Sequence, residues 1–249
     1  MYFSVFVLGI TFMAILTTPA ARAGECVVLL HGLARSANSL LFIEWSLKRA
    51  GYDVVNLDYP SKAATIEDLA DRAIPKALYR CRKAEMIHFV THSMGGILLR
   101  YYMSRANPQP LRLGRSVMLG PPNRGTPLID QLNDLPGFEI WNGGAGMQLG
   151  AGFESLPNKL RPVEFELGII AGSQSLNPLL SAIIEGPNDG KVAVESTKVG
   201  GMTDHIVMSV THTFMMNNPS VIEKVLVFLR SALSSKINRV PFTPFLGAF

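Results

Sequence analysis

The stretch Met86-Ile87-His88-Phe89-Val90-Thr91-His92-Ser93-Met94-Gly95-Gly96 decides the fold of this chain. Its first six residues form a largely apolar run of strand length without alternation, which is typical of a strand buried on both faces. A helical pattern follows directly and continues to about Asn107. A buried strand that enters a helix across a serine and two glycines indicates a sharp elbow, which pushes the Ser93 hydroxyl outward.

Five further short runs have the same strand character and are separated by helical patterns. These runs are Cys26–His31, Tyr52–Leu57, Ser116–Leu119, Phe165–Ala171 and His205–Val210. The alternation predicts an α/β fold with a mostly parallel six-stranded sheet covered by helices on both faces. In such a sheet, functional side chains follow the strands directly, at their carboxyl ends.

Two of the helices carry clear local signals. Thr65 and Asp68 form a capping box, and Pro75 inside the helical pattern that follows predicts a kink or a split. The last helix begins near Pro219, and an apolar stripe runs along it through Val221, Val225, Leu226, Leu229 and Leu233.

Composition excludes several classes of protein. The chain has 249 residues, of which 48% are hydrophobic and 17% are charged, so it fits one folded domain and not a disordered chain. Lys and Arg number 23 against 19 Asp and Glu, for a net charge of +4. Because the basic residues are scattered, no nucleic-acid surface is indicated. The two cysteines fit neither a zinc site nor a CxxC pair, and no metal is expected.

Residues 1–23 have the pattern of a secretory signal peptide. No charged side chain occurs before Arg22, Pro19 follows an apolar run, and Ala21-Arg22-Ala23 supplies a cleavage site. The alternative is an uncleaved membrane anchor, because such an uncharged segment is long enough to span a bilayer. We expect cleavage after Ala23, export to the periplasm or the medium, and a mature domain over residues 24–249.

Export places Cys26 and Cys81 in an oxidising compartment, where pairing is the default. Cys26 opens the first strand, and Cys81 lies shortly before the strand that starts at Met86. If these two strands are parallel neighbours, both cysteines lie at the same edge of the sheet and can form a disulfide. The alternative is two buried, unpaired thiols.

The residues that follow the strands suggest nucleophilic chemistry. A serine nucleophile needs a base to take its proton and an acid to orient that base. His212 follows the last strand and is the candidate base, while Asp189, in an Asp-Gly turn, is the candidate acid. A tetrahedral intermediate also needs two backbone N–H donors, which we assign to Leu33 and Met94. The competing acids are Asp204, at the wrong end of its strand, Asp130 and Asp134.

Together these residues resemble the α/β-hydrolase superfamily, and within it the small bacterial lipases and esterases. The matching pieces are His31-Gly32, the elbow at 91–96, the run Gly120–Pro127, Asn188-Asp189-Gly190 and His212. The resemblance implies a Ser–His–Asp triad, an oxyanion hole at Leu33 and Met94, and no cofactor. It also implies the strand order 2-1-3-4-5-6, without the first two strands of the full family sheet. Thr91 departs from the family pattern, which usually has glycine there.

Two segments remain open. Residues 137–160 mix bulky apolar side chains with glycines where the family inserts its caps, so they form either a moving lid or a surface loop with Trp141 packed in the core. The apolar tail 236–249 either packs on the domain or contacts a membrane or a partner.

We therefore expect an exported serine hydrolase that cleaves carboxylic esters, with a small-molecule or lipid ester as substrate and peripheral membrane contact left open. One alternative is an acyltransferase with the same triad. Another is a non-catalytic binding module of the cell envelope with a hydrolase-like fold.

Overall fold

The computed structural model describes residues 24–105 and 112–231. The predicted signal peptide at 1–23 and the tail at 236–249 lie outside the described residues. A single six-stranded sheet has the order β2-β1-β3-β4-β5-β6, and all five neighbouring pairs are parallel, which confirms the expected order. Its strands are β1 (Glu25–Leu30), β2 (Asp53–Leu57), β3 (Met86–His92), β4 (Leu113–Leu119), β5 (Leu167–Gln174) and β6 (Asp204–Thr211).

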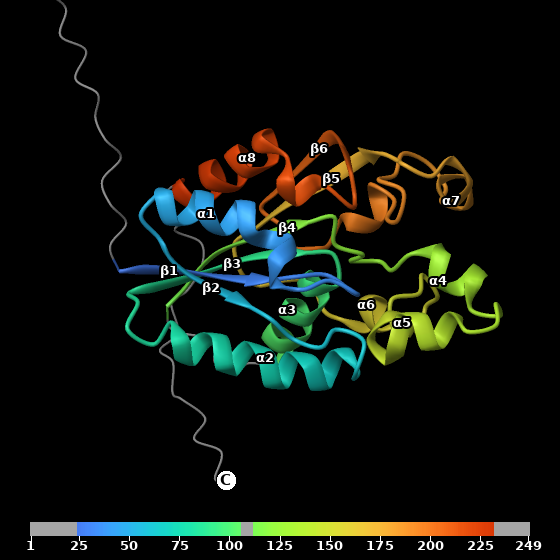
Figure 1. Cartoon of the computed structure of the whole chain (residues 1–249), viewed down its shortest axis with the longest axis horizontal. Coiled ribbons are helices and arrows are strands. Elements are labelled where there is room, and N and C mark those ends of the chain that lie inside the picture. Colours follow the sequence, from blue (N-terminus) through green and yellow to red (C-terminus); the bar gives the residue numbers. More distant parts are fainter. Residues whose placement is uncertain (1–23, 106–111, 232–249) are drawn as a thin grey trace, which may run out of the picture.

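Helices cover both faces of this sheet (Figure 1). The helices α1 (Leu41–Arg49) and α8 (Pro219–Arg230) lie on one face, and α2 (Ile66–Arg80) and α3 (Met94–Arg105) lie on the other. The central strands are buried on both sides, so successive residues of β1 enter different clusters. Val27 and Leu29 pack with α1 and α8, whereas Val28 and Leu30 pack with α2 and α3. This explains why these strands read as continuous apolar runs.

The helix α2 begins as the capping box predicts, because the Thr65 Oγ1 accepts a hydrogen bond from the Asp68 N–H at 3.3 Å. The predicted split at Pro75 is wrong, since α2 is one helix from Ile66 to Arg80. Proline has no N–H, so Pro75 cannot donate the helical hydrogen bond to the carbonyl oxygen of Asp71. Both residues lie on the exposed side of the helix, where water can donate to that oxygen instead. The buried side, which includes Ile74 and Ala77, holds the helix against the sheet.

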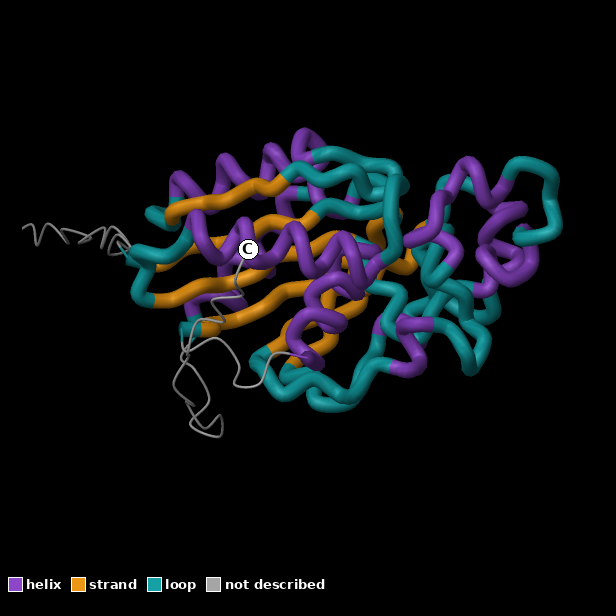
Figure 2. The backbone as a smooth tube through the Cα atoms, turned by 90° about the horizontal axis from the view of Figure 1, so that it is seen from below, coloured by secondary structure: helices purple, strands orange, loops and turns teal. Residues whose placement is uncertain are grey.

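Short helices and loops gather at one end of the molecule (Figure 2). The helices labelled there in Figure 1 are α4 (Pro127–Leu132), α5 (Phe138–Met147), α6 (Leu156–Lys159) and α7 (Pro178–Ile183). Three short 3₁₀ helices complete the described elements: η1 (Ala37–Leu40), η2 (Glu195–Thr197) and η3 (Met215–Asn217). Among the described helices, none combines the length and the apolar character needed to cross a bilayer.

A disulfide ties the opposite end of the sheet together. Cys26 in β1 is bonded to Cys81 at the end of α2, with the two Cα atoms 5.8 Å apart, so the alternative of two free thiols is wrong. Both cysteines are buried. Because β1 pairs with β3 along its whole length, the bridge also fixes the connection that leads from α2 into β3.

Removing this bridge should destabilise the domain. The two cysteines are 55 residues apart in sequence. For a loop of this length, the chain-entropy model gives about 4 kcal/mol. We expect Cys26→Ser/Cys81→Ser to lower the free energy of unfolding in urea by about 2–4 kcal/mol relative to the oxidised protein. Reductant should destabilise the wild type and leave the double variant unchanged; equal stability of the two oxidised proteins would contradict the prediction.

Candidate active site

Ser93 occupies a strained turn between β3 and α3. Its φ is +53°, and among the described residues only Ala34 is another non-glycine residue with positive φ. This conformation costs free energy in an L-residue and is held here by the neighbouring structure. The Ser93 N–H donates to the carbonyl oxygen of Leu119 in β4 at 2.8 Å. The serine is therefore fixed by its backbone while its side chain stays partly exposed.

The elbow requires close contact between α3 and β1. A Cβ added to Gly95 would lie 2.5 Å from the carbonyl oxygen of Leu30 and 2.8 Å from that of His31, so only glycine fits there. Thr91, which stands where the family usually has glycine, is buried. The Thr91 Oγ1 lies 3.3 Å from the position that a Cβ on Gly96 would have. Because Gly96 has no side chain, the side chain of Thr91 fits beside it.

The structure brings the three predicted side chains together. His212 comes directly after β6, and its Nε2 lies 3.0 Å from the Ser93 Oγ. Its Nδ1 lies 2.7 Å from the Asp189 Oδ2. Because an ionised carboxylate only accepts hydrogen bonds, Nδ1–H donates to Asp189 and Nε2 is left to accept the hydroxyl proton of Ser93. The three groups thus form one hydrogen-bonded chain at the carboxyl edge of the sheet.

The Asp189 carboxylate is oriented by its own turn. Its Oδ1 accepts from the N–H groups of Lys191 at 3.0 Å and Val192 at 2.8 Å, which leaves Oδ2 for His212. The Asp189 carbonyl oxygen also accepts from the His212 N–H at 3.0 Å. The side chain is completely buried, so these N–H groups and His212 take the place of water around the charge.

The competing acids lie elsewhere. Asp204 is at the start of β6, the opposite edge of the sheet, and its Oδ1 accepts from the His205 N–H at 2.8 Å. Asp130 accepts from the Ala151 N–H at 2.6 Å, and Asp134 is exposed. None of them takes the place of Asp189 beside His212.

The predicted oxyanion donors flank the serine. Gly32 lies against it, since a Cβ on Gly32 would be 3.1 Å from the Ser93 Cβ, and Leu33 follows in the same turn. Met94 comes directly after Ser93 and starts α3. No acceptor among the described residues engages the N–H of Leu33 or of Met94. Within the described part of the chain, both N–H groups therefore lack a protein acceptor.

A layer of contacts that the sequence did not predict holds the turn at 31–34. The His31 Nδ1–H donates to the Gly32 carbonyl oxygen at 2.9 Å, and the Tyr59 N–H donates to the His31 Nε2 at 3.3 Å. The Tyr59 hydroxyl donates to the His31 carbonyl oxygen, and the two rings stack 4.0 Å apart. The Ser61 Oγ accepts from the Ala34 N–H at 3.0 Å. The available signal was the position of Tyr59 and Ser61 in the short segment that follows β2.

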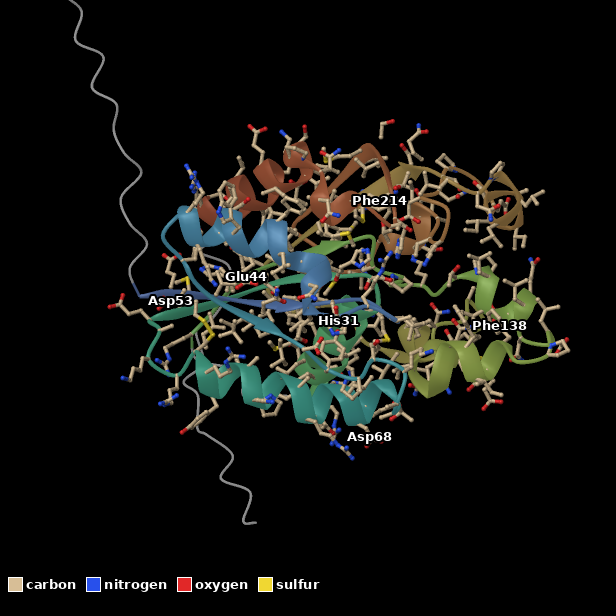
Figure 3. All side chains as sticks on the ribbon, in the orientation of Figure 1. His31, Glu44, Asp53, Asp68, Phe138 and Phe214 are labelled. Carbon is tan, nitrogen blue, oxygen red and sulfur yellow. A yellow bond between two sulfur atoms is a disulfide. The ribbon has the colours of Figure 1, made fainter. Side chains whose placement is uncertain are left out.

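Burial lowers the pKa of the His31 imidazole below its usual value, although the nearby hydrogen bonds and Asp58 raise it. Figure 3 shows His31 near the centre of the molecule, with Phe138 of α5 further out beyond the strand ends.

Among residues 24–105 and 112–231, no three His, Cys, Asp or Glu side chains are placed to hold a metal ion.

Solved structures match the fold of this chain, whereas no family model and no curated protein matches its sequence. The mature lipase BlEst2 of Bacillus licheniformis is 18% identical, with a TM-score of 0.66 over 83% of this chain and 93% of that chain. Phospholipase PlaB of Legionella pneumophila is 16% identical, with a TM-score of 0.61 over 83% of this chain and 58% of that one. Lipase B of Aspergillus fumigatus is 15% identical, with a TM-score of 0.59 over 80% and 50%.

This chain has an α/β-hydrolase fold, which it shares with these solved lipase structures. In this α/β-hydrolase fold, Ser93 leaves β3, His212 leaves β6 and the Asp189 turn follows β5, so all three lie at the carboxyl edge of the sheet.

A methyl group at position 95 should break the elbow. We expect Gly95→Ala to lower the free energy of unfolding by about 1–3 kcal/mol or more, because backbone oxygens cannot move aside as a side chain can. Urea unfolding measures this change. Gly152→Ala is the matched control, since a Cβ on Gly152 meets nothing within 4 Å. A Gly95→Ala protein as stable as the Gly152→Ala protein would contradict the packing described here.

Proposed function

We propose that this chain is a serine hydrolase that cleaves carboxylic esters, with lipid-like acyl esters as its substrates. The observation that carries the proposal is the hydrogen-bonded chain from Ser93 through His212 to Asp189, with distances of 3.0 and 2.7 Å. The names of the structural neighbours, two lipases and a phospholipase, support the same chemistry.

In the first half of the reaction, the Ser93 Oγ attacks the ester carbonyl carbon and the His212 Nε2 takes the hydroxyl proton. The carbonyl oxygen becomes negative, and the N–H groups of Leu33 and Met94 stabilise it. The tetrahedral intermediate then collapses. The bond to the alkoxy oxygen breaks, His212 gives its proton to that oxygen, and the acyl group stays on Ser93.

In the second half, water takes the place of the alcohol. His212 removes a proton from the water, the resulting oxygen attacks the acyl carbon, and Ser93 leaves with the proton that His212 returns. Asp189 holds the ring of His212 in the required tautomer and stabilises its positive charge in both halves. The buried carboxylate is suited to this role because its other oxygen is already held by two N–H groups.

Exposed apolar side chains beyond the strand ends support a lipid-like substrate and contact with a lipid surface. They come from the α4–α5 segment, the loop before α6, and α7 with the loop before it: Leu135, Ile140, Trp141, Phe153, Leu176 and Leu179. A contiguous exposed apolar patch is typical of an interaction surface, and we infer that these side chains form one. We propose that these six residues, the apolar rim, touch the lipid from which the ester is taken.

The segment 137–160 contributes Ile140, Trp141 and Phe153 to the apolar rim. The expectation of a loop with Trp141 in the core is wrong, because Trp141 lies on α5, is 74% exposed and has the Lys62 Nζ 5.4 Å from its ring centre. The second half of α5 packs inward, where Ala145 donates its N–H to the Ala64 carbonyl oxygen at 3.0 Å. We propose that the outer half of α5 moves as a lid. We also propose that the protein is exported, which the disulfide supports.

Removing the serine hydroxyl tests the function. We expect Ser93→Ala to lower kcat for p-nitrophenyl esters about 10³-fold or more while the unfolding transition stays in place. A fluorophosphonate probe should label the wild type at Ser93 and leave the variant unlabelled.

Asp189→Asn should lose up to about 10⁴-fold in kcat, because the histidine tautomer is no longer fixed. Asp204→Asn, which keeps its oxygen for the His205 N–H, should retain wild-type kcat.

Full ester turnover by Ser93→Ala would end the proposal. A wild type that is folded but neither labelled nor active would favour the binding module. Product analysis with added alcohols separates hydrolysis from acyl transfer to an acceptor other than water.

Charges placed on the apolar rim should weaken lipid binding. Ile140 is 86% exposed and Leu179 is 81% exposed, on two different helices. We expect Ile140→Asp/Leu179→Asp to reduce binding to phosphatidylcholine vesicles about tenfold or more in co-sedimentation, since a buried charge is costly. Turnover of soluble p-nitrophenyl acetate should not change. Val227→Asp on α8, where the side chain is 57% exposed, is the control, and equal vesicle binding by all three proteins would refute the surface.

A further inference from the structure

A second histidine, which the proposed mechanism does not use, lies beside the site. His92 is the last residue of β3, directly before Ser93, and its side chain is buried. Its Nε2 lies 3.0 Å from the main-chain carbonyl oxygen of His212. A carbonyl oxygen only accepts hydrogen bonds, so Nε2 carries the proton and donates it. The residue before the nucleophile thus binds the backbone of the candidate base.

The other side of the His92 ring faces the turn that carries Leu33. The buried Nδ1 has no hydrogen-bond partner among the described residues. It would lie 3.0 Å from a Cβ on Gly32, which places the ring against that turn. The rings of His92 and His212 are 4.8 Å apart. One imidazole therefore fills the space between the elbow, the oxyanion turn and the loop of His212.

The surroundings of His92 favour its neutral form. Burial is the largest cause that lowers its pKa well below the usual value, and the neighbouring His212, Arg35 and Lys191 lower this pKa further. A protonated ring would also need an acceptor for Nδ1–H, which the described residues do not supply. His92 can therefore remain an unchanged donor to the backbone while His212 gains and loses its proton.

His212 depends on such a support because it lies in a turn after β6. Its main-chain N–H is held by the Asp189 carbonyl oxygen at 3.0 Å, and its main-chain carbonyl is held by His92. Without the His92 donor, the carbonyl loses its partner inside the protein, and the turn must move to find another. A displacement of about 1 Å between reacting groups can lower a rate about 10²-fold.

We propose that His92 is a positioning residue, whose Nε2–H fixes the backbone of His212 so that its imidazole remains within reach of Ser93. This inference rests on the proposed function. His92 is joined to Ser93 by a peptide bond and to the His212 backbone by a hydrogen bond. This connection is separate from the hydrogen bond between the side chains of Ser93 and His212.

The test compares two side chains of similar length that differ in the donor. His92→Met has no N–H, and we expect kcat for p-nitrophenyl esters to fall about 10–100-fold with KM within about threefold. His92→Gln offers an amide N–H, and we expect it to recover at least half of the loss on a logarithmic scale. The acid limb of the kcat/KM profile should move in His92→Met, because the environment of His212 changes, and return toward the wild type in His92→Gln.

His88→Met is the matched control. His88 is a buried histidine near the other end of β3, where its Nδ1 accepts from the Arg115 N–H at 2.9 Å. We expect this variant to lower Tm but to leave kcat and the pH profile unchanged. Equal losses of kcat in His92→Met and His92→Gln, or a loss in His88→Met that matches the loss in His92→Met, would overturn the positioning role.

A second measurement does not depend on turnover. The His212 Nδ1–H, held by Asp189 at 2.7 Å, should give a protected imidazole proton signal in NMR spectra of the wild type and of His92→Gln. We expect this signal to broaden or disappear in His92→Met and to persist in His88→Met. If the wild type hydrolyses no ester, the proposed function fails, while this signal still decides whether His92 positions His212. An unchanged signal in folded His92→Met would refute the proposal.

Discussion

The strained backbone of Ser93 is the constraint on which the site depends. A φ of +53° is unfavourable for serine, and it persists because the residue is fixed between a strand and a helix that nearly touch. Gly95 allows α3 to approach the end of β1, because it has no side chain. On the other side, the hydrogen bond from the Ser93 N–H to the Leu119 carbonyl oxygen holds the turn against β4. The hydroxyl is thereby presented at the edge of the sheet from a backbone that its neighbours hold in place.

The parallel order of the strands supplies the rest of the site. The strands that precede the candidate site residues all end at the same edge, so residues far apart in the chain meet there. Their backbones are then held in pairs: His31 by Tyr59, Ala34 by Ser61, and His212 by Asp189 and His92. Hydrogen bonds among fixed groups need little reorganisation when charge develops, which is the property that favours hydrolytic chemistry.

The amino and carboxyl ends of the sheet differ in the contacts that their residues make. At the amino end, the disulfide and the buried ion pair between Arg115 and Glu166, with 2.8 Å between Nε and Oε2, hold strands and helices together. At the carboxyl end, exposed apolar side chains and short helices replace regular packing. The sequence changes accordingly, from uninterrupted apolar strands to segments rich in glycine and proline. Stability and the proposed contact with lipid therefore act at separate places in one domain.

The sequence by itself determined the six strands, the elbow at Ser93, the start of α2 at Thr65, and the candidate acid and base, because each depends on a short local pattern or on its place directly after a strand. The family resemblance added the strand order. Only the tertiary structure decided that α2 continues through Pro75, since this depends on which side of the helix meets water. Only the fold, too, showed that Tyr59 supports His31 and that His92 binds His212. These partners are 28 and 120 residues apart in sequence, and packing alone brings their polar atoms together.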